Sequence, residues 1–314
     1  MGGDRAPTET VAGAVAAARA GVDVVLVGDE VSLKAELAQY GLDLPIVDAP
    51  EVIGMGEDVS KAIREKTRSS IVSCARLVAG GEASGFVSAG STGAAMAAAV
   101  VVIGRLPGVL RPTIASVLPT PGRPTVLLDS GANPEVKPDH LVQFAIMGSA
   151  FFEVHFGDGE AKVGLLNIGE ERSKGRQLER EAYPLLESSS IFFVGNVEGR
   201  DVASENVDVI VTDGFTGNVF LKTSEGIAGM VTGMVKDALR GIPSEIADPV
   251  SAKLGPIVHQ LDYENIGGAH LLGVGGVVVL AHGAATRISI ENALRMASEG
   301  AEQGLVEKIT SRIT

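Results

Sequence analysis

The stretch VIVTDGFTGN, residues 209–218, places an acid, two glycines, a hydroxyl and an amide directly after a short apolar run. The apolar run is typical of a buried strand, and the apolar residues after Asn218 recur at three- and four-residue steps, which predicts a helix. Glycine lets a backbone approach a ligand closely, and a helix start presents unpaired N–H groups at the positive end of its dipole. Gly214, Thr216, Gly217 and Asn218 are therefore candidates for binding an anion such as phosphate, with Asp213 beside them.

A second stretch, SAGSTGA at residues 88–94, repeats the pattern of strand, glycine turn and helix start. In an open parallel sheet, ligands bind at the carboxyl ends of the strands. We therefore expect six polar loops to share one edge: Ser88–Gly93, Asp129–Asn133, Asn167–Lys174, Gly195–Asp201, Asp213–Asn218 and Ala281–Gly283. For any single loop, tight turns and helix capping are the simpler explanation. The six together favour a working site, because capping alone does not require so many amides, acids and cations.

Single residues in these loops each have a structural alternative. His282 ends an apolar strand and is a structural or a catalytic histidine with equal support. Lys174 lies in the charged loop GEERSKGR, where a solvated face is the simpler explanation. Asp213 could serve only as a helix cap, and Asn133 and Asn196, each beside a glycine, could hold turns.

Several familiar catalytic signatures are missing from the sequence. It contains no G-x-x-x-x-G-K-[ST], no G-x-G-x-x-G after a strand, no H-E-x-x-H and no G-x-S-x-G. The single cysteine excludes an internal disulfide and a cysteine-based zinc site. We therefore expect neither a metal nor a cofactor.

Apolar strands and helical patterns alternate along the whole chain. This alternation predicts one α/β domain over residues 1–314, with a doubly wound, mostly parallel sheet in a three-layer α/β/α arrangement. Residues 22–29 are an example of a predicted buried strand, following a predicted helix at 6–21. The irregular, proline-containing segment 240–256 is predicted to be either a helix–helix turn or the exposed tip of a protruding hairpin.

The composition fits a folded soluble protein, with 45% hydrophobic and 21% charged residues. A net charge of −13 argues against nucleic acid as a partner. No apolar run approaches the length of about 20 residues that a membrane crossing needs, and MGGDRAP does not resemble a signal peptide. A cytoplasmic protein is the simplest expectation.

Motifs along nearly the whole chain resemble the phosphate acyltransferases of bacterial phospholipid synthesis. They include MGGDRAP, SAGSTGA, LLDSGANPEVKPDH, VGNVEGRD and VTDGFTGN. The resemblance implies transfer of a fatty acyl group from acyl-(acyl carrier protein) to inorganic phosphate, which gives acyl phosphate. It also implies a fold similar to isocitrate dehydrogenases and phosphotransacetylases, a homodimer, and peripheral work at the inner face of the cytoplasmic membrane. The family usually begins with a short strand before MGGD that ends in an aspartate. That strand and acid are missing before Met1, so we expect either that the true start lies upstream or that the chain lacks one strand of the sheet.

Given the resemblance, the polar loops receive expected roles. The catalytic candidates are Asn196, Asp213, His282 and Lys174. The phosphate-binding candidates are Gly90, Ser91, Thr92, Gly93, Gly214, Thr216, Gly217, Asn218 and Arg200. The substrate-binding candidates are Asn133, Glu170 and Glu198. Because the acyl carrier protein is acidic, the candidates for carrier docking are the basic residues Lys61, Arg64, Arg68, Arg105 and Arg111.

Three other functions compete with this one. A phosphotransacetylase that uses acyl-coenzyme A shares the fold and differs only in its thiol carrier. An NAD-linked decarboxylating dehydrogenase shares the fold but needs a metal-binding acid cluster, of which the sequence has no clear trace. A scaffold that binds acyl chains at a membrane needs an apolar tip but not the polar loops.

Overall fold

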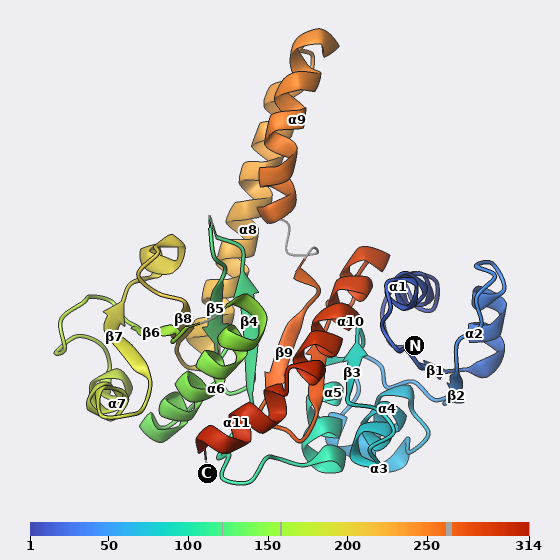
Figure 1. Cartoon of the computed structure of the whole chain (residues 1–314), viewed down its shortest axis with the longest axis horizontal. Coiled ribbons are helices and arrows are strands. Elements are labelled where there is room, and N and C mark those ends of the chain that lie inside the picture. Colours follow the sequence, from blue (N-terminus) through green and yellow to red (C-terminus); the bar gives the residue numbers. More distant parts are fainter. Residues whose placement is uncertain (121, 158, 262–265, 314) are drawn as a thin grey trace.

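The computed structural model describes residues 1–120, 122–157, 159–261 and 266–313. Figure 1 shows a central sheet with helices around it and a long helical hairpin that projects from one side. The strands are β1 (Leu26–Gly28), β2 (Ile46–Asp48), β3 (Gly85–Ser88), β4 (Thr113–Leu118), β5 (Thr125–Leu128), β6 (Lys162–Leu166), β7 (Phe192–Val197), β8 (Val209–Val211), β9 (Ala269–Leu272) and β10 (Val277–Leu280).

The helices follow the strands along most of the chain. They are α1 (Thr8–Arg19), α2 (Glu30–Leu37), α3 (Val59–Glu65), α4 (Ser70–Ala79), α5 (Thr92–Ala98), α6 (Pro138–Phe156), α7 (Gln177–Glu187), α8 (Gly214–Leu239), α9 (Ser244–Leu261), α10 (Arg287–Glu302) and α11 (Leu305–Ile313). A π-helical stretch, Ala99–Ile103, continues α5, and a 3₁₀ turn, Gly199–Ala203, follows β7. Several starts are fixed by side-chain caps, as at α2, where Asp29 accepts from the Ser32 N–H.

The main sheet has eight strands in the order β3-β10-β9-β4-β5-β8-β6-β7. Four neighbouring pairs are parallel and three are antiparallel, so the mostly parallel sheet that the sequence predicted is confirmed. The antiparallel pairs all lie in the middle and involve β9 and β4, which the alternation of strands and helices did not reveal. Because three reversals separate them, β3 and β10 run opposite to β5, β8, β6 and β7.

Helices cover both faces of this sheet and enclose two large cores. On one face, Phe144 and Phe151 of α6 are fully buried in a cluster that includes residues of α7 and α11. On the other face, α4 and α5 pack on Phe86 of β3 and Leu280 of β10, and Phe220 of α8 packs near β8. The three-layer arrangement therefore follows from apolar strands that are buried on both faces.

The segment expected to be irregular, residues 240–256, is mostly helical. A short turn joins α8 to α9, which begins at Ser244 and contains both Pro249 and Pro256. The two helices form the projecting hairpin of Figure 1. In the described residues, no helix combines the length and the apolar character needed to cross a bilayer.

A cavity of about 960 Å³ separates the small β1–β2 sheet from the main sheet. It is lined on one side by residues 22–27, around β1, and on the other by residues 83–90, around β3. Among the described strands, β1 pairs only with β2 and β3 only with β10. Two unpaired strand edges therefore face each other across the cavity.

Candidate functional site

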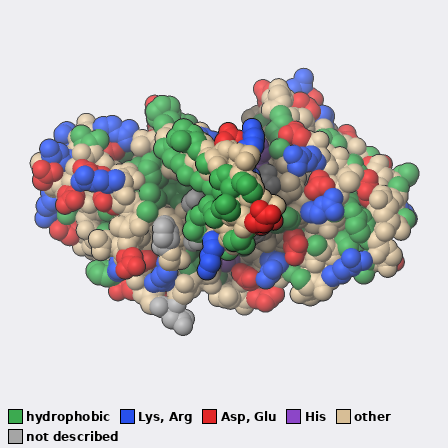
Figure 2. Space-filling model, turned by 90° about the horizontal axis from the view of Figure 1, so that it is seen from above, with side chains coloured by type: hydrophobic (Ala, Val, Ile, Leu, Met, Phe, Trp, Pro, Cys, Tyr) green, Lys and Arg blue, Asp and Glu red, His purple; other side chains and the backbone are tan. Residues whose placement is uncertain are grey.

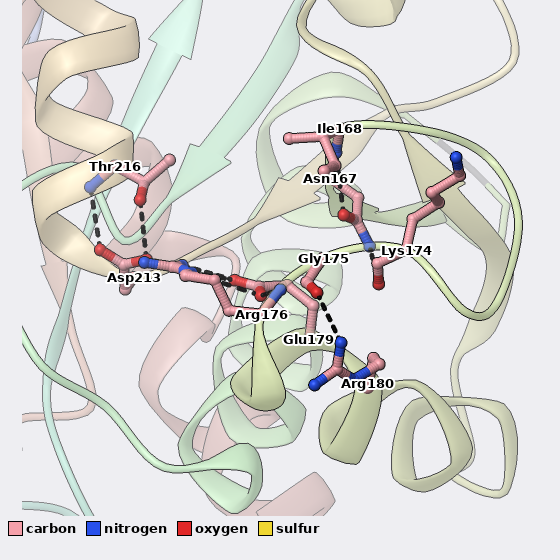
Figure 3. A network of polar contacts seen from close by, with 9 residues as sticks. All are labelled: Asn167, Ile168, Lys174, Gly175, Arg176, Glu179, Arg180, Asp213 and Thr216. Atoms are coloured by element: carbon pink, nitrogen blue, oxygen red, sulfur yellow. Dashed lines mark hydrogen bonds and ion pairs between the residues drawn. The ribbon is translucent and has the colours of Figure 1, made fainter.

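The start of α8 is capped by the carboxylate of Asp213. This side chain is 3% exposed and accepts from the Thr216 N–H at 2.9 Å and from the Thr216 hydroxyl at 2.8 Å. It also accepts a close hydrogen bond from the guanidinium of Arg176 (Figure 3). Although burial raises its pKa, the hydrogen bonds from Arg176 and Thr216 outweigh that effect, so the pKa of Asp213 lies below its usual value.

The loop after β5 packs against the same helix start and is organised by Asp129. The carboxylate of Asp129 accepts from the N–H groups of Ile114, Gly131, Ala132 and Asn133. Burial raises its pKa above the usual value despite these four donors. The buried carboxylate therefore fixes the path of the loop toward α8.

Asn133 holds this loop together and uses its polar atoms within the protein. Its Nδ2 donates to the Pro112 carbonyl and to Asp129 Oδ2, each at 2.8 Å. Its carbonyl accepts from the Gly214 N–H at 2.8 Å. Asn133 was a substrate-binding candidate, and in the structure its Nδ2 holds the loop after β5 in place.

The glycines of the α8 turn are needed for this packing. A Cβ at Gly217 would lie 1.9 Å from the Asp129 carbonyl oxygen, and one at Gly214 would lie 2.7 Å from the Asn133 carbonyl oxygen. The first-turn N–H groups of Gly214 and Thr216 are already bound, to Asn133 and Asp213. The predicted anion site at this helix start is therefore largely filled by the protein itself, because its own loop and carboxylate occupy it.

The loop after β6 lies beside Asp213 (Figure 3). Asn167 Nδ2 donates to the Lys174 carbonyl at 3.2 Å, while the Lys174 ammonium points away from Asp213, 3.9 Å from Glu171. Asn196 Nδ2 donates to the Glu171 carbonyl at 2.9 Å, and Asn196 is 7% exposed. Lys174 and Asn196, both catalytic candidates, therefore support this loop, in which Glu170 is exposed.

Two further candidates lie after β7, on the same edge of the sheet. Arg200 forms an ion pair with Glu198 at 2.7 Å and its side chain is 74% exposed. Gly199 between them lies against Phe220 of α8. The opposite charges of Arg200 and Glu198 neutralise each other, so the pair offers little net attraction to phosphate.

The start of α5 is more open. Ser91 caps it by accepting from the Ala94 N–H at 3.3 Å, and the Gly90 N–H donates to the Ser88 hydroxyl at 3.2 Å. Within the described part of the chain, the N–H groups of Ser91, Thr92 and Gly93 meet no hydrogen-bond acceptor. A Cβ at Gly93 would meet only the Val59 side chain, at 3.4 Å.

His282 lies next to this turn. The Ala281 N–H donates to the Ser88 carbonyl at 2.9 Å, which joins the ends of β10 and β3. The Asp4 N–H donates to the Gly283 carbonyl at 2.8 Å. The exposed imidazole accepts from the Ala284 N–H through Nδ1 at 3.2 Å, which places the proton of the neutral ring on Nε2.

The six polar loops do not share one edge, so that expectation was wrong. The Ser88–Gly93 and Ala281–Gly283 loops follow strands that run opposite to those before Asp129–Asn133, Asn167–Lys174, Gly195–Asp201 and Asp213–Asn218. Four strand steps separate β10 from β8, which is about 19 Å at about 4.8 Å a step. The structure therefore divides the candidates into an α5 cluster, with Gly90–Gly93 and His282, and an α8 cluster, with Asp213, Asn196 and their neighbours.

The basic candidates also divide between the clusters. Lys61 and Arg64 are exposed on α3, whose first residue, Val59, contacts Gly93 of the α5 turn. Arg68 is paired with Asp48 at 2.8 Å. Arg105 donates to the carbonyls of Val109 and Leu110, and Arg111 precedes the residue whose carbonyl binds Asn133.

The sequence pattern did not reveal the Arg176 contact with Asp213, which joins residues 37 positions apart. The only local signal was the spacing of Arg176 and Glu179, whose carboxylate accepts from the Arg176 N–H at 2.7 Å at the start of α7. In the described residues, no group of three or more His, Cys, Asp or Glu is placed to hold a metal ion.

Comparison with known proteins defines the class. The model of the family described as "Fatty acid synthesis protein" matches residues 1–308, and the chain belongs to this family. Its relatives include the "Phosphate acyltransferase" of Pelotomaculum thermopropionicum, 47% identical over 100% of this chain and 93% of that protein. The "Phosphate acyltransferase" of Desulforamulus reducens is 48% identical over 98% of this chain and 94% of that protein.

Solved structures support the fold assignment alone. A phosphotransacetylase from Streptococcus pyogenes matches with a TM-score of 0.64 at 16% identity, over 95% of this chain and 92% of that one. A branched-chain phosphotransacylase from Enterococcus faecalis matches with a TM-score of 0.54 at 14% identity, over 88% and 98%. The predicted phosphotransacetylase-like fold is therefore confirmed.

Proposed function

We propose that this protein transfers a fatty acyl group from acyl-(acyl carrier protein) to inorganic phosphate, giving acyl phosphate for phospholipid synthesis. The observation that carries the proposal is the identity of 47% to a phosphate acyltransferase over the full length of the chain. Relatives of this similarity and coverage keep the same fold and the same loops around a site. The exposed polar turns described above are consistent with an enzyme rather than a scaffold.

Phosphate is proposed to bind at the α5 turn. Unpaired N–H groups at a helix start, near the positive end of its dipole, bind phosphate in many proteins. The N–H groups of Ser91, Thr92 and Gly93 provide this donor set, while those of Gly214 and Thr216 at α8 already have protein acceptors. The continuation of α5 as a π-helix to Ile103 lengthens the helical segment behind the turn.

The proposed reaction needs no metal ion, because phosphate near neutral pH is a competent nucleophile. A phosphate oxygen attacks the thioester carbonyl carbon, and the resulting tetrahedral oxyanion collapses by breaking the C–S bond. The acyl group leaves on phosphate, and the departing thiolate takes up a proton from solvent. His282, with its ring proton on Nε2, is proposed to donate a hydrogen bond to the oxyanion or to the thiolate.

The α8 cluster is proposed to frame the acyl donor. Asn218 lies in the second turn of α8, beside Gly131. Its side chain is exposed, so it is the most accessible amide of the α8 cluster. Asp213, Lys174 and Asn196 are proposed to act through the loop that they hold in place. Glu170 and Glu198 remain candidates for contacts with the donor.

The acidic carrier protein is proposed to dock beside the α5 turn. Lys61 and Arg64 are exposed on α3, which contacts that turn through Val59 and Gly93. Arg105 and Arg111 form a second basic area near Asn133. Attraction of this kind weakens as salt increases, because exposed charges are screened within about 10 Å at 0.1 M.

The hairpin is proposed to join two copies of the chain in a homodimer. Ile227, Met230, Val231 and Met234 of α8 are between 42% and 64% exposed, and their spacing places them on one helix face. Figure 2, which looks down on the hairpin, shows hydrophobic side chains gathered over it. Contiguous apolar surface of this kind marks an interaction site. Near the tip, Ile242 and Ile246 are exposed, and peripheral contact with the inner face of the cytoplasmic membrane is proposed there.

The test is phosphate-dependent release of free thiol from a long-chain acyl-(acyl carrier protein), with acetyl-coenzyme A measured in parallel. The expected result is release from the carrier, with acyl phosphate trapped as a hydroxamate by hydroxylamine. Activity confined to acetyl-coenzyme A would instead assign a phosphotransacetylase. No release from either donor would favour an acyl-binding scaffold.

A further inference from the structure

Arg176 connects the starts of α7 and α8, two helices that are separated in the sequence by β7 and β8 (Figure 3). Its Nε donates to Glu179 Oε1 at 3.0 Å, and its Nη2 donates both to Glu179 and to Asp213. Asp213 and Glu179 are 3% and 5% exposed, whereas the Arg176 side chain is 57% exposed. Two buried carboxylates, one capping α8 and one in the first turn of α7, therefore share one cation.

The arrangement makes the charge of Asp213 depend on Arg176. Two carboxylates this close to one guanidinium repel each other when the cation is removed, and one of them then binds a proton more readily. The hydrogen bonds to Glu179 and to Asp213 raise the pKa of Arg176, so it stays charged. Breaking a buried ion pair on one side is destabilising because the remaining charge has no partner.

No other described cation contacts Asp213. Lys174 points away and lies near Glu171, and Arg180 donates to the Gly175 carbonyl at 3.1 Å. Asp129 is the remaining acid beside the turn, since its Oδ2 would lie 2.9 Å from a Cβ at Gly214. That carboxylate is held by N–H groups of its own loop and adds negative charge near Asp213.

We propose that Arg176 is a positioning residue: by bridging Glu179 and Asp213, it holds Asp213 as a charged cap on α8 and fixes the loop after β6 against that helix. The side of the site that meets the acyl donor then keeps one shape. Only the effect on catalysis rests on the proposed function; the bridge itself is a property of the fold.

The test compares Arg176→Met with the double variant Arg176→Met/Glu179→Gln. In Arg176→Met the folded-state pKa of Asp213 rises above its unfolded value, so stability is retained at low pH and lost as pH increases through that raised pKa. We expect the Tm to fall by about 5 °C at pH 8 and by less than half as much at pH 5. The double variant should regain most of the lost Tm at pH 8. The glutamine removes one of the two negative charges, and its side-chain oxygen can still accept from the backbone N–H of residue 176.

A Tm deficit that is equal at both pH values, with no recovery in the double variant, would overturn the proposal in favour of simple packing. If Arg176→Met does not fold, Arg176→Lys is a milder test of the bridge. Lysine keeps the positive charge but lacks the planar fork that spans both acids, so the Tm deficit should again be larger at pH 8 than at pH 5 but smaller than in Arg176→Met. Activity separates this proposal from the proposed function. Wild-type protein without phosphate-dependent thiol release would contradict the function and leave the Tm result intact. With an active wild type, Arg176→Met should raise the KM for the acyl donor at least threefold.

Discussion

Two turns with nearly the same sequence, GFTG at residues 214–217 and GSTG at 90–93, perform different tasks in this fold. At α8 the loop after β5 presses on the turn, and Asp213 and Asn133 accept its N–H groups. At α5 the backbone of Gly2 and Gly3 packs on Ala89 and Gly90, but the N–H groups of Ser91, Thr92 and Gly93 remain unbound in the described part of the chain. The difference shows that the task of a glycine turn depends on whether its neighbours supply acceptors for the N–H groups of the helix start, as they do at α8 and not at α5.

The largest predicted contrast is between the last glycines of the two turns. Gly217→Ala places a methyl group 1.9 Å from the Asp129 carbonyl oxygen, whereas Gly93→Ala meets only the Val59 side chain at 3.4 Å, which is ordinary van der Waals contact. We expect Gly217→Ala to lose about 3 kcal/mol or more of unfolding free energy. Gly93→Ala should lose about 0.5 kcal/mol or less. Thermal unfolding of both variants measures this, and similar Tm values would remove the distinction between the turns.

His282 gives the next largest effect, and it concerns turnover rather than stability. Because the imidazole is exposed, His282→Ala should leave the Tm nearly unchanged while kcat falls about 100-fold, as expected for loss of a hydrogen-bond donor to the oxyanion or the thiolate. The measurement is thiol release at saturating phosphate and acyl donor. A kcat within twofold of the wild type would show that this histidine is structural.

The cavity beside the α5 turn leads to a third prediction. We expect the cavity between β1 and β3 to accept one additional strand, since both of its walls are strand edges without a partner among the described strands. An N-terminal extension with an alternating apolar strand sequence should raise the Tm by about 5 °C, because it buries apolar area and pairs exposed backbone groups. A Gly/Ser extension of equal length is the matched control. Equal Tm values for the two extended chains would show that no added strand pairs with β1 and β3 in the cavity.

The smallest effect is expected from the basic areas beside each turn. Lys61→Glu/Arg64→Glu, next to the α5 turn, should raise the KM for the carrier substrate about fivefold at low salt and less at 0.5 M salt. Arg111→Glu, near Asn133, should raise it by less than twofold. The reverse order would place the carrier at the α8 cluster instead.

Much of the fold was predictable because each strand–turn–helix unit of the parallel part of the sheet has a recognisable local sequence pattern. The buried strands before Gly90, Asp129 and Asp213 and the amphipathic helix after Asn218 all follow the expected alternation. The antiparallel strands β4 and β9 were missed, since no helix separates them from β5 and β10 and the alternation of strands and helices is therefore broken there. Because of the three antiparallel pairings of these two strands, β3 and β10 run opposite to β5, β8, β6 and β7, so the error in placing the loops follows from the error in the strands.

The site was less predictable than the fold because similar local sequences meet different neighbours. Nothing near GFTG in the sequence shows that the carbonyl of Asp129 lies against Gly217. The contact of Arg176 with Asp213 spans 37 residues and likewise has no local signature. The position of His282 beside Gly90–Gly93, by contrast, follows from the parallel pairing of β3 with β10, because both segments come directly after these strands.

The most direct test of the phosphate site at the α5 turn is the KM for phosphate of Thr92→Pro. Proline is well tolerated at the first position of a helix, and the extended backbone of Ser91 before it, with ψ of 114°, suits a following proline. The substitution therefore removes one N–H donor with little effect on the fold. We expect the KM for phosphate to rise about tenfold, with an unchanged Tm and an unchanged KM for the acyl donor. An unchanged KM for phosphate in Thr92→Pro, together with an increase in Asn218→Ala, would contradict the account and return phosphate to the α8 turn.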